Sequence, residues 1–111
     1  AVITFGEAPE ADCRLLATRG DADGVTAEIE LRGATLPVRI GAPGHHMALN
    51  ACATLAAVAA LGADVGRAAA ALAMFGAGAG RGERVTLRLP GGTATLIDDS
   101  YNASPASIRA G

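Results

Sequence analysis

The chain has 111 residues, half of them hydrophobic and only three aromatic, so one small core must be built mostly from alanine and other small side chains. Its net charge is −2, which excludes a strongly basic nucleic-acid surface. All nine basic residues are arginine, which excludes, within this chain, a site that needs a P-loop, Schiff-base or carbamylated lysine.

Strands are expected in the first forty residues. A short buried strand is predicted over Ala1–Phe5, and a second over Cys13–Thr18. Apolar and polar residues then alternate in Val25–Leu31 and again in Thr35–Ile40, which is typical of half-buried strands. Turn residues separate the last three segments. We therefore predict an antiparallel meander.

Two helices follow. The first is predicted over Met47–Leu61 and is apolar nearly all round, so we expect it to be buried on most faces. Asn50 and Thr54 are its polar interior positions, four residues apart and therefore on one face. A buried amide at Asn50 needs partners, which could be a ligand or local backbone. The second helix is predicted over Val65–Phe75, with Asp64 as its N-cap.

Side chains that bind metals are present but poorly arranged. Asp21 and Asp23 lie in a turn that lacks the further acidic ligands of an EF-hand loop. His45 and His46 are adjacent, so they should point in different directions, and no Cys or carboxylate cluster is near them in sequence. We therefore assign no metal ligand within this chain.

The cysteines and the hydropathy bear on the compartment. Cys13 and Cys52 are far apart in sequence, so two buried free thiols in a reducing cytosol are favoured over a disulfide. No signal peptide is visible. The apolar stretch Ala48–Leu61 is shorter than the roughly 20 residues that span a bilayer. We expect a cytoplasmic protein without membrane insertion and without a nucleic-acid partner.

The segment Phe75–Gly82 alternates glycine and alanine. It is neither a G-x-G-x-x-G nor a Walker A motif, because the glycine spacing fails and no Lys-Ser/Thr follows. We interpret it as a flexible connector between two domains. Arg81 lies near its end and, from the surrounding residues alone, is interpreted as an ordinary solvated arginine.

A strand pair is predicted over Arg84–Leu89 and Thr93–Ile97, around a Pro-Gly-Gly turn. The apolar run of the second strand suggests burial, and Ser104 and Pro105 suggest a helix start. Between them lie five polar residues: Asp98, Asp99, Ser100, Tyr101 and Asn102. Ligands of open α/β sheets sit at the carboxyl ends of strands, so a ligand site here competes with a simple Asx-type turn.

Two stretches resemble the Mur ligase family. Residues 98–105 read DDSYNASP and resemble the family's DDSYNANP, with Ser104 in place of the usual Asn. Residues 44–51 read GHHMALNA and resemble the G-x-H-N-x-x-N-A element, in which His46 and Asn50 match while Met47 replaces an Asn. The Gly-Arg pair that ends at Arg81 and the TFG of residues 4–6 also resemble family elements.

The resemblance implies an α/β fold in two parts. Residues 1–82 would be the C-terminal part of a P-loop-type central, ATP-binding domain, with an antiparallel meander and two helices. Residues 83–111 would be the first strands of a Rossmann-like C-terminal domain. The phosphate-binding loop and the magnesium ligands are expected outside this chain. The chain alone is therefore expected to be an inactive part of an enzyme.

The resemblance also assigns site residues. Four residues would bind ATP, namely His46, Asn50, Arg81 and Asp99. Asn50 would bond the adenine edge with His46 beside it, Arg81 would face the phosphates, and Asp99 would accept bonds from the ribose hydroxyls. The seam between nucleotide and incoming substrate would be lined by Tyr101, Asn102 and Ser104, while Asp98 would hold the turn. The cofactors implied are ATP and Mg²⁺, and no catalytic residue is assigned.

The Ser-Tyr-Asn wording resembles one branch of the family, which joins D-Ala-D-Ala to UDP-MurNAc-tripeptide through an acyl phosphate in peptidoglycan synthesis. Related ligases of the family have other sequences at this position, such as a Tyr-Ala-His type sequence. Three alternatives remain: a sibling that adds a different amino acid, a folylpolyglutamate-type ligase, and a non-catalytic nucleotide-binding module.

Overall fold

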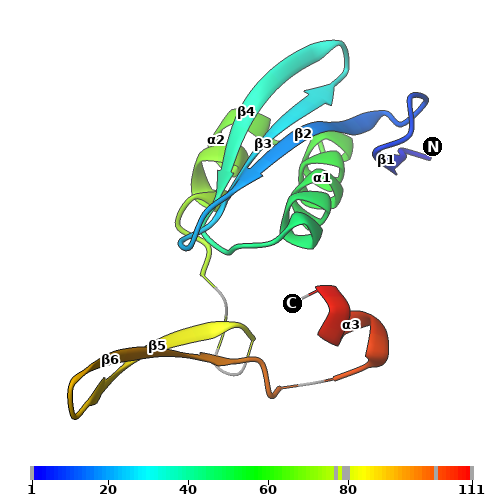
Figure 1. Cartoon of the computed structure of the whole chain (residues 1–111). Helices are drawn as coiled ribbons and strands as arrows, with labels where there is room; N and C mark the ends of the chain where they lie inside the picture. Colours follow the sequence, from blue (N-terminus) through cyan, green and yellow to red (C-terminus); the bar gives the residue numbers. More distant parts are fainter. Residues whose placement is uncertain (1, 77, 79–80, 102, 111) are drawn as a thin grey trace. The chain divides into compact units, whose positions relative to one another are not determined.

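The computed structural model describes residues 2–76, 78, 81–101 and 103–110 (Figure 1). The chain divides into two compact units, which are described separately. We refer to Ala1–Phe75 as the core unit and to Gly76–Gly111 as the hairpin unit. The division falls at the start of the Gly–Ala connector. No helix in the described residues has both the length and the hydropathy needed to cross a membrane.

The core unit contains a mixed four-stranded sheet in the order β1-β2-β3-β4. Its strands are β1 (Phe5–Gly6), β2 (Cys13–Gly20), β3 (Val25–Leu31) and β4 (Ala34–Ile40). Strands β2 to β4 form the predicted antiparallel meander, which is confirmed, and β1 adds a parallel edge. The buried strand predicted over Ala1–Phe5 is wrong, because β1 has two residues and Phe5 is 53% exposed at the sheet edge.

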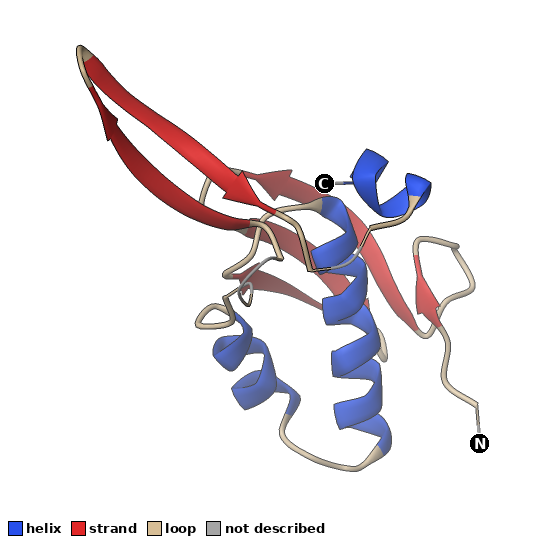
Figure 2. Cartoon of the chain, turned by 90° about the horizontal axis from the view of Figure 1, so that it is seen from below, coloured by secondary structure: helices blue, strands red, loops and turns tan. Residues whose placement is uncertain are grey.

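Two helices cover one face of this sheet, α1 (His45–Ala60) and α2 (Val65–Leu72) (Figures 1 and 2). The alternation in β3 buries Val25, Ala27, Ile29 and Leu31 on that face. Val25 lies opposite Ile40 and Ala27 opposite Val38, so β4 buries the matching side chains. The face predicted from the alternation is therefore the face that the helices cover.

Helix α1 buries only one of its faces. The buried side chains recur at helical spacing, at Ala48, Ala51, Cys52, Leu55, Ala56 and Ala59. Asn50, Thr54 and Ala57 are exposed, so the prediction that this helix is buried on most faces is wrong. The physical reason is that alanine is tolerated on both faces, so an alanine-rich pattern does not mark the solvent side. Asp64 caps α2 as predicted, accepting from the Arg67 N–H at 3.0 Å, but α2 ends at Leu72 rather than Phe75.

The two cysteines meet in the core of this unit. Cys13 on β2 and Cys52 on α1 are both buried free thiols, as predicted. Burial is the main cause that raises the pKa of the Cys13 thiol. Burial together with the neighbouring Cys13 raises the pKa of Cys52 to about 12. Both side chains therefore act as small apolar core residues.

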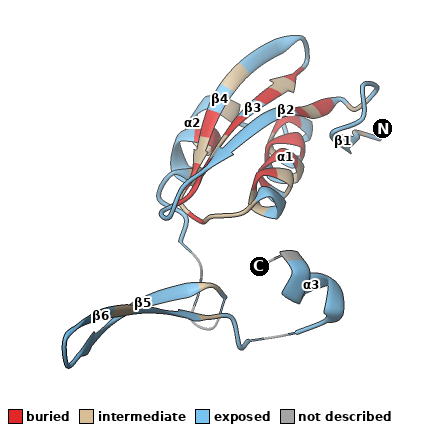
Figure 3. Cartoon of the chain, in the orientation of Figure 1, coloured by how far each residue is buried: buried red, intermediate tan, exposed pale blue. Residues whose placement is uncertain are grey.

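The hairpin unit consists of β5 (Glu83–Leu89) paired with β6 (Gly92–Asp98), followed by α3 (Pro105–Ala110). Ser104 caps α3, since its Oγ accepts from the Ser107 N–H at 3.1 Å. In the hairpin unit, none of the residues whose burial is described is buried (Figure 3). The predicted burial of the second strand is wrong, since Leu96 is 49% and Ile97 56% exposed. The strands are an antiparallel hairpin, and their membership of a Rossmann-like domain stays a prediction.

Candidate functional site

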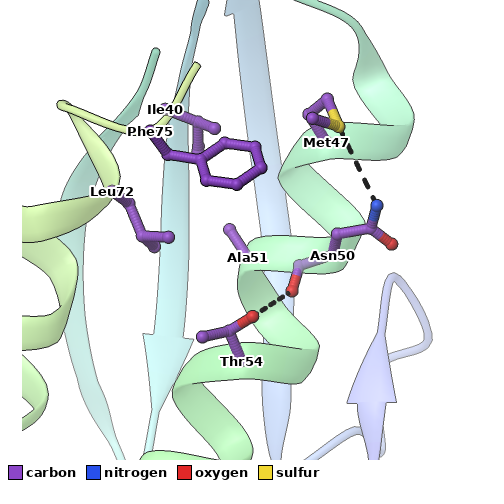
Figure 4. A pocket seen from close by; sticks show the side chains of 7 residues that line it. All are labelled: Ile40, Met47, Asn50, Ala51, Thr54, Leu72 and Phe75. Carbon is purple, nitrogen blue, oxygen red and sulfur yellow. Dashed lines mark hydrogen bonds between the residues drawn. The ribbon is translucent and has the colours of Figure 1, made fainter. Parts of the chain in front are cut away.

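The core unit has a pocket of about 250 Å³ between the first turns of α1, the end of β4 and the segment after α2 (Figure 4). Its wall is largely apolar and is formed by Ile40, Met47, Asn50, Ala51, Thr54, Leu72 and Phe75. Binding sites for small molecules are typically apolar hollows with a few polar groups. The polar groups here are the side chains of Asn50 and Thr54.

A close backbone approach builds one wall of the pocket. The Gly41 N–H donates to the Leu72 carbonyl at 3.0 Å. A Cβ at Gly41 would collide with the backbone oxygens of Ala73 and Phe75. Only glycine therefore lets the end of α2 close onto the end of β4, and this approach sets Phe75 against the pocket. Phe75 was predicted only as the end of the second helix and the start of the connector, and nothing in the sequence pattern marked it as a wall residue.

Asn50 lies at the rim of the pocket and is exposed, so the predicted buried amide is wrong. Its Nδ2 approaches the Met47 Sδ at 3.9 Å, a weak contact, while the Thr54 hydroxyl donates to the Asn50 backbone carbonyl at 2.9 Å. In Figure 4 the amide group points away from the Phe75 ring. The amide carries both a donor and an acceptor, and it must turn toward the pocket to offer them to a ligand at its mouth.

The two histidines turn apart at the start of α1, as predicted. His45 Nε2 lies 3.1 Å from Glu7 Oε1, and its Nδ1 lies 3.3 Å from Thr18 Oγ1. The His46 ring lies over Gly44, where a Cβ would come within 2.6 Å of its Cε1. Gly44 has φ +117°, which disfavours any other residue. His46 and Asn50 are one helical turn apart and both are exposed.

The described residues contain no group of three or more His, Cys, Asp or Glu side chains that could hold a metal ion. A resident metal therefore has no ready-made set of ligands in this part of the chain.

The predicted residues of the hairpin unit gather where β6 ends. Gly82 N–H donates to the Asp98 carbonyl at 2.8 Å, and the Arg81 guanidinium carbon lies 4.0 Å from the centre of the Tyr101 ring. Asp98 Oδ1 accepts from the Ser100 N–H at 3.1 Å, so Asp98 holds the turn as predicted. Hydrogen bonds from the Ser100 hydroxyl and N–H lower the pKa of Asp98.

The remaining predicted residues of this unit differ in availability. The Asp99 side chain is exposed. The Ser104 hydroxyl is engaged with Ser107, at 3.1 Å from both its N–H and its Oγ. Asn102 lies outside the residues that the structure describes. Ser104 thus has a local structural role, whereas Asp99 can meet a ligand.

No family model matches the chain. Curated relatives do. The chain is 38% identical over 104 residues to UDP-N-acetylmuramate–L-alanine ligase of Deinococcus radiodurans, covering 92% of this chain and 21% of that protein. It is 36% identical over 109 residues to the ligase of the same name from Streptomyces coelicolor, covering 97% and 22%. The chain thus spans about a fifth of the length of these relatives.

Solved structures match over the same range. MurF from Acinetobacter baumannii superimposes with a TM-score of 0.84 at 27% identity, covering 97% of this chain and 22% of that one. MurC (UDP-N-acetylmuramate–alanine ligase) from Thermotoga maritima superimposes with a TM-score of 0.80 at 28% sequence identity, and the match covers 97% of this chain and 25% of that one. MurF from T. maritima, determined in complex with ADP, superimposes with a TM-score of 0.74 at 27% sequence identity, and the match covers 97% of this chain and 24% of that one. The curated relatives named here belong to the L-alanine branch, whereas the wording of residues 98–105 favoured the D-Ala-D-Ala branch.

Proposed function

We propose that this chain forms part of the nucleotide site of a Mur ligase. The premise is that the chain is a homologue of the Mur ligases, which are ATP-dependent amide ligases of peptidoglycan synthesis. The observation that carries this proposal is the apolar pocket beside α1 with an available amide at its rim. Residues 1–82 would belong to the central, ATP-binding domain and residues 83–111 to the C-terminal domain.

The pocket fits a flat, uncharged ring better than a charged group. Met47, Leu72 and Phe75 offer apolar surface to the faces of a ring, and no charged residue lines the pocket. The edge of adenine carries donors and acceptors side by side, and the Asn50 amide can complement both. His46, one turn earlier on α1, would be a neighbour of that amide.

The hairpin unit would supply the other contacts of the nucleotide. Asp99 is an exposed carboxylate that can accept hydrogen bonds from ribose hydroxyls. Arg81 would meet the phosphates, where a guanidinium donates charge-assisted hydrogen bonds. Tyr101 and Asn102 would border the incoming substrate, whereas the hydroxyl of Ser104, the third residue predicted there, is engaged in capping α3. Mg²⁺ would neutralise charge on the transferring phosphoryl group, with its ligands expected outside this chain.

The chemistry of such a ligase is activation of a carboxylate. Transfer of the γ-phosphoryl group makes an acyl phosphate, an amine attacks its carbonyl carbon, and phosphate leaves. The residues of this chain would bind and orient ATP for that transfer. No residue here is assigned to proton transfer or to nucleophilic attack.

For the substrates we propose UDP-N-acetylmuramate and L-alanine, which the names of the curated relatives carry. The second candidate is the addition of D-Ala-D-Ala to UDP-MurNAc-tripeptide. It is favoured by residues 98–105 and by the likeness to MurF structures.

The decisive experiment is phosphate release by a ligase that contains this chain. ATP-dependent turnover with UDP-N-acetylmuramate and L-alanine would support the first candidate. Turnover only with UDP-MurNAc-tripeptide and D-Ala-D-Ala would support the second. Binding of ATP without any turnover would leave a non-catalytic nucleotide-binding module.

The nucleotide contact is tested separately. Asn50→Ala should raise the KM for ATP about 3- to 10-fold, since one hydrogen bond is lost. Ala57→Ser, on the exposed face of the same helix but outside the pocket, is the matched control. An unchanged KM for ATP in Asn50→Ala would remove Asn50 from the site.

A further inference from the structure

The Arg81 side chain in the hairpin unit does not extend freely from its connector. Its guanidinium carbon lies over the Tyr101 ring, 4.0 Å from the ring centre, which is well inside the range of cation–π contacts. Within the described residues, Arg81 takes part in neither of the two ion pairs. Its charge is therefore held by a ring face rather than neutralised by a carboxylate.

Arg81 precedes β5 and Tyr101 follows β6, so the antiparallel pairing brings both residues to the open end of the hairpin. Glu83 pairs with Asp98 in the last rung of the β5–β6 ladder. Just beyond it, the Gly82 N–H reaches the Asp98 carbonyl at 2.8 Å, with Gly82 at φ +79°. On the other side, Asp98 Oδ1 holds the Ser100 N–H at 3.1 Å and so fixes the turn that leads to Tyr101.

We propose that Tyr101 is a positioning residue that holds the guanidinium of Arg81 ready for an anionic oxygen of the nucleotide. This inference rests on the proposed function, because it takes the phosphate role of Arg81 from there. A guanidinium that lies parallel to an aromatic ring uses one of its faces for the contact, while its N–H donors lie in its plane and point outward. Stacking on Tyr101 and bidentate donation to a phosphate are therefore compatible.

The contact between Arg81 and Tyr101 should favour ligand binding by restricting the Arg81 side chain in advance. A free arginine loses much side-chain entropy when it is fixed on a ligand, and a preformed contact reduces that loss. The contact uses the ring and not the hydroxyl, so phenylalanine should serve at this position while an aliphatic residue should not.

The test is a mutant cycle in a ligase that contains this chain, measured with ATP. Arg81→Ala should raise the KM for ATP, and Tyr101→Leu should raise it about 3- to 10-fold. Tyr101→Phe should recover most of that loss. Tyr101→Leu should add nothing in the Arg81→Ala background, because its effect acts through Arg81. Arg88→Ala, on the same hairpin, controls for the loss of one charge.

A spectroscopic readout separates the stack from the catalysis. Tyr101 is the only tyrosine of the chain, and there is no tryptophan. The ring current should shift the δ-methylene protons of Arg81 upfield in the wild type and in Tyr101→Phe, and this shift should vanish in Tyr101→Leu.

The outcomes are distinguishable. A normal KM in Arg81→Ala would overturn the phosphate role in the proposed function, and the positioning role with it. An impaired Arg81→Ala with a normal Tyr101→Leu, or additive effects in the cycle, would overturn the positioning role alone.

Discussion

The core unit and the hairpin unit both contain strands with apolar residues on one face, yet only one of them has a core. Every buried hydrophobic residue of the described chain belongs to Ala1–Phe75. In the hairpin unit Val85 lies opposite Leu96 and Leu87 opposite Ala94, which gives one apolar face. Val85, Leu87 and Leu96 are each 40% exposed or more.

The difference lies in what covers each face. Helices α1 and α2 pack on β3 and β4, whereas the described residues of the hairpin unit provide no comparable cover. An isolated two-stranded hairpin is marginally stable in water. Alternation therefore tells which face of a strand prefers burial, but it does not tell whether the same chain supplies the partner. Each of the following changes tests this contrast, from the largest expected effect to the smallest.

The largest effect is expected in the core unit. Leu55 is fully buried, so Leu55→Ala leaves a cavity and should lower the free energy of unfolding by about 2–5 kcal/mol. Urea unfolding followed by far-UV circular dichroism measures this. Leu61→Ala, at a position 84% exposed, should stay within about 0.5 kcal/mol. Equal effects for the two variants would contradict the hydrophobic core that distinguishes this unit.

A smaller effect is expected where the core unit presents the site. Gly44 has φ +117° and ψ 143°, and a Cβ there would crowd the His46 ring. Gly44→Ala should cost about 1–3 kcal/mol and should displace His46 at the start of α1. Urea unfolding and the His46 ring signals in NMR spectra check both effects. Gly20→Ala is the control, since a Cβ added there meets only the Gly24 carbonyl oxygen, at 4.0 Å. If Gly44→Ala lowered the free energy of unfolding no more than Gly20→Ala does, the proposed strain at Gly44 would be contradicted.

The third effect depends on pH. The Arg39 guanidinium, which bonds both carboxylate oxygens of Asp21 at 2.9 Å, holds the pKa of Asp21 well below its usual range. A lowered folded-state pKa stabilises the fold above the unfolded value, near 3.8, and this stabilisation is lost as pH falls through the folded value.

Between pH 5 and pH 2, the free energy of unfolding should therefore fall less in Asp21→Asn than in the wild type. Urea-unfolding midpoints measured at a series of pH values check this. Asp23→Asn, two residues away, is the matched control. Parallel acid limbs in the wild type and Asp21→Asn would contradict this account.

The smallest effect is expected on the hairpin. Leu87→Thr replaces an exposed apolar side chain on β5 with one that suits a strand, so it should change the stability of the core unit by less than about 0.5 kcal/mol. The same urea series measures it. A loss above 1 kcal/mol would mean that this face is covered within the chain, and the contrast between the units would fail.

Much of the core unit could be predicted because its signals are local. Alternation in Val25–Leu31 fixed the buried face, and Asp64 and Ser104 were recognisable as caps from neighbouring residues alone. The burial of α1 could not be predicted correctly, since alanine carries little information about solvent. The exposure of Asn50 follows from that same ambiguity.

The site needed contacts between residues distant in sequence. Phe75 joins Ile40 in one wall only because Gly41 lets two backbones approach. Arg81 and Tyr101 meet only through the register of the β5–β6 hairpin. Neither pairing leaves a periodic trace in the sequence, so the roles of His46, Asn50, Arg81 and Asp99 came from family resemblance and remain predictions.

Native-state hydrogen exchange of the chain, resolved by residue, tests the central claim most directly. This claim is that the pocket is built on the hydrophobic core of the core unit, whereas Arg81 and Asp99, which we propose as further contacts of the nucleotide, lie in a hairpin unit that has no such core. We predict that amides of β3 and of the buried face of α1 exchange only through global unfolding, and that amides of β5 and β6 exchange at least roughly 100-fold faster. Hairpin amides as well protected as those of β3 would contradict the account.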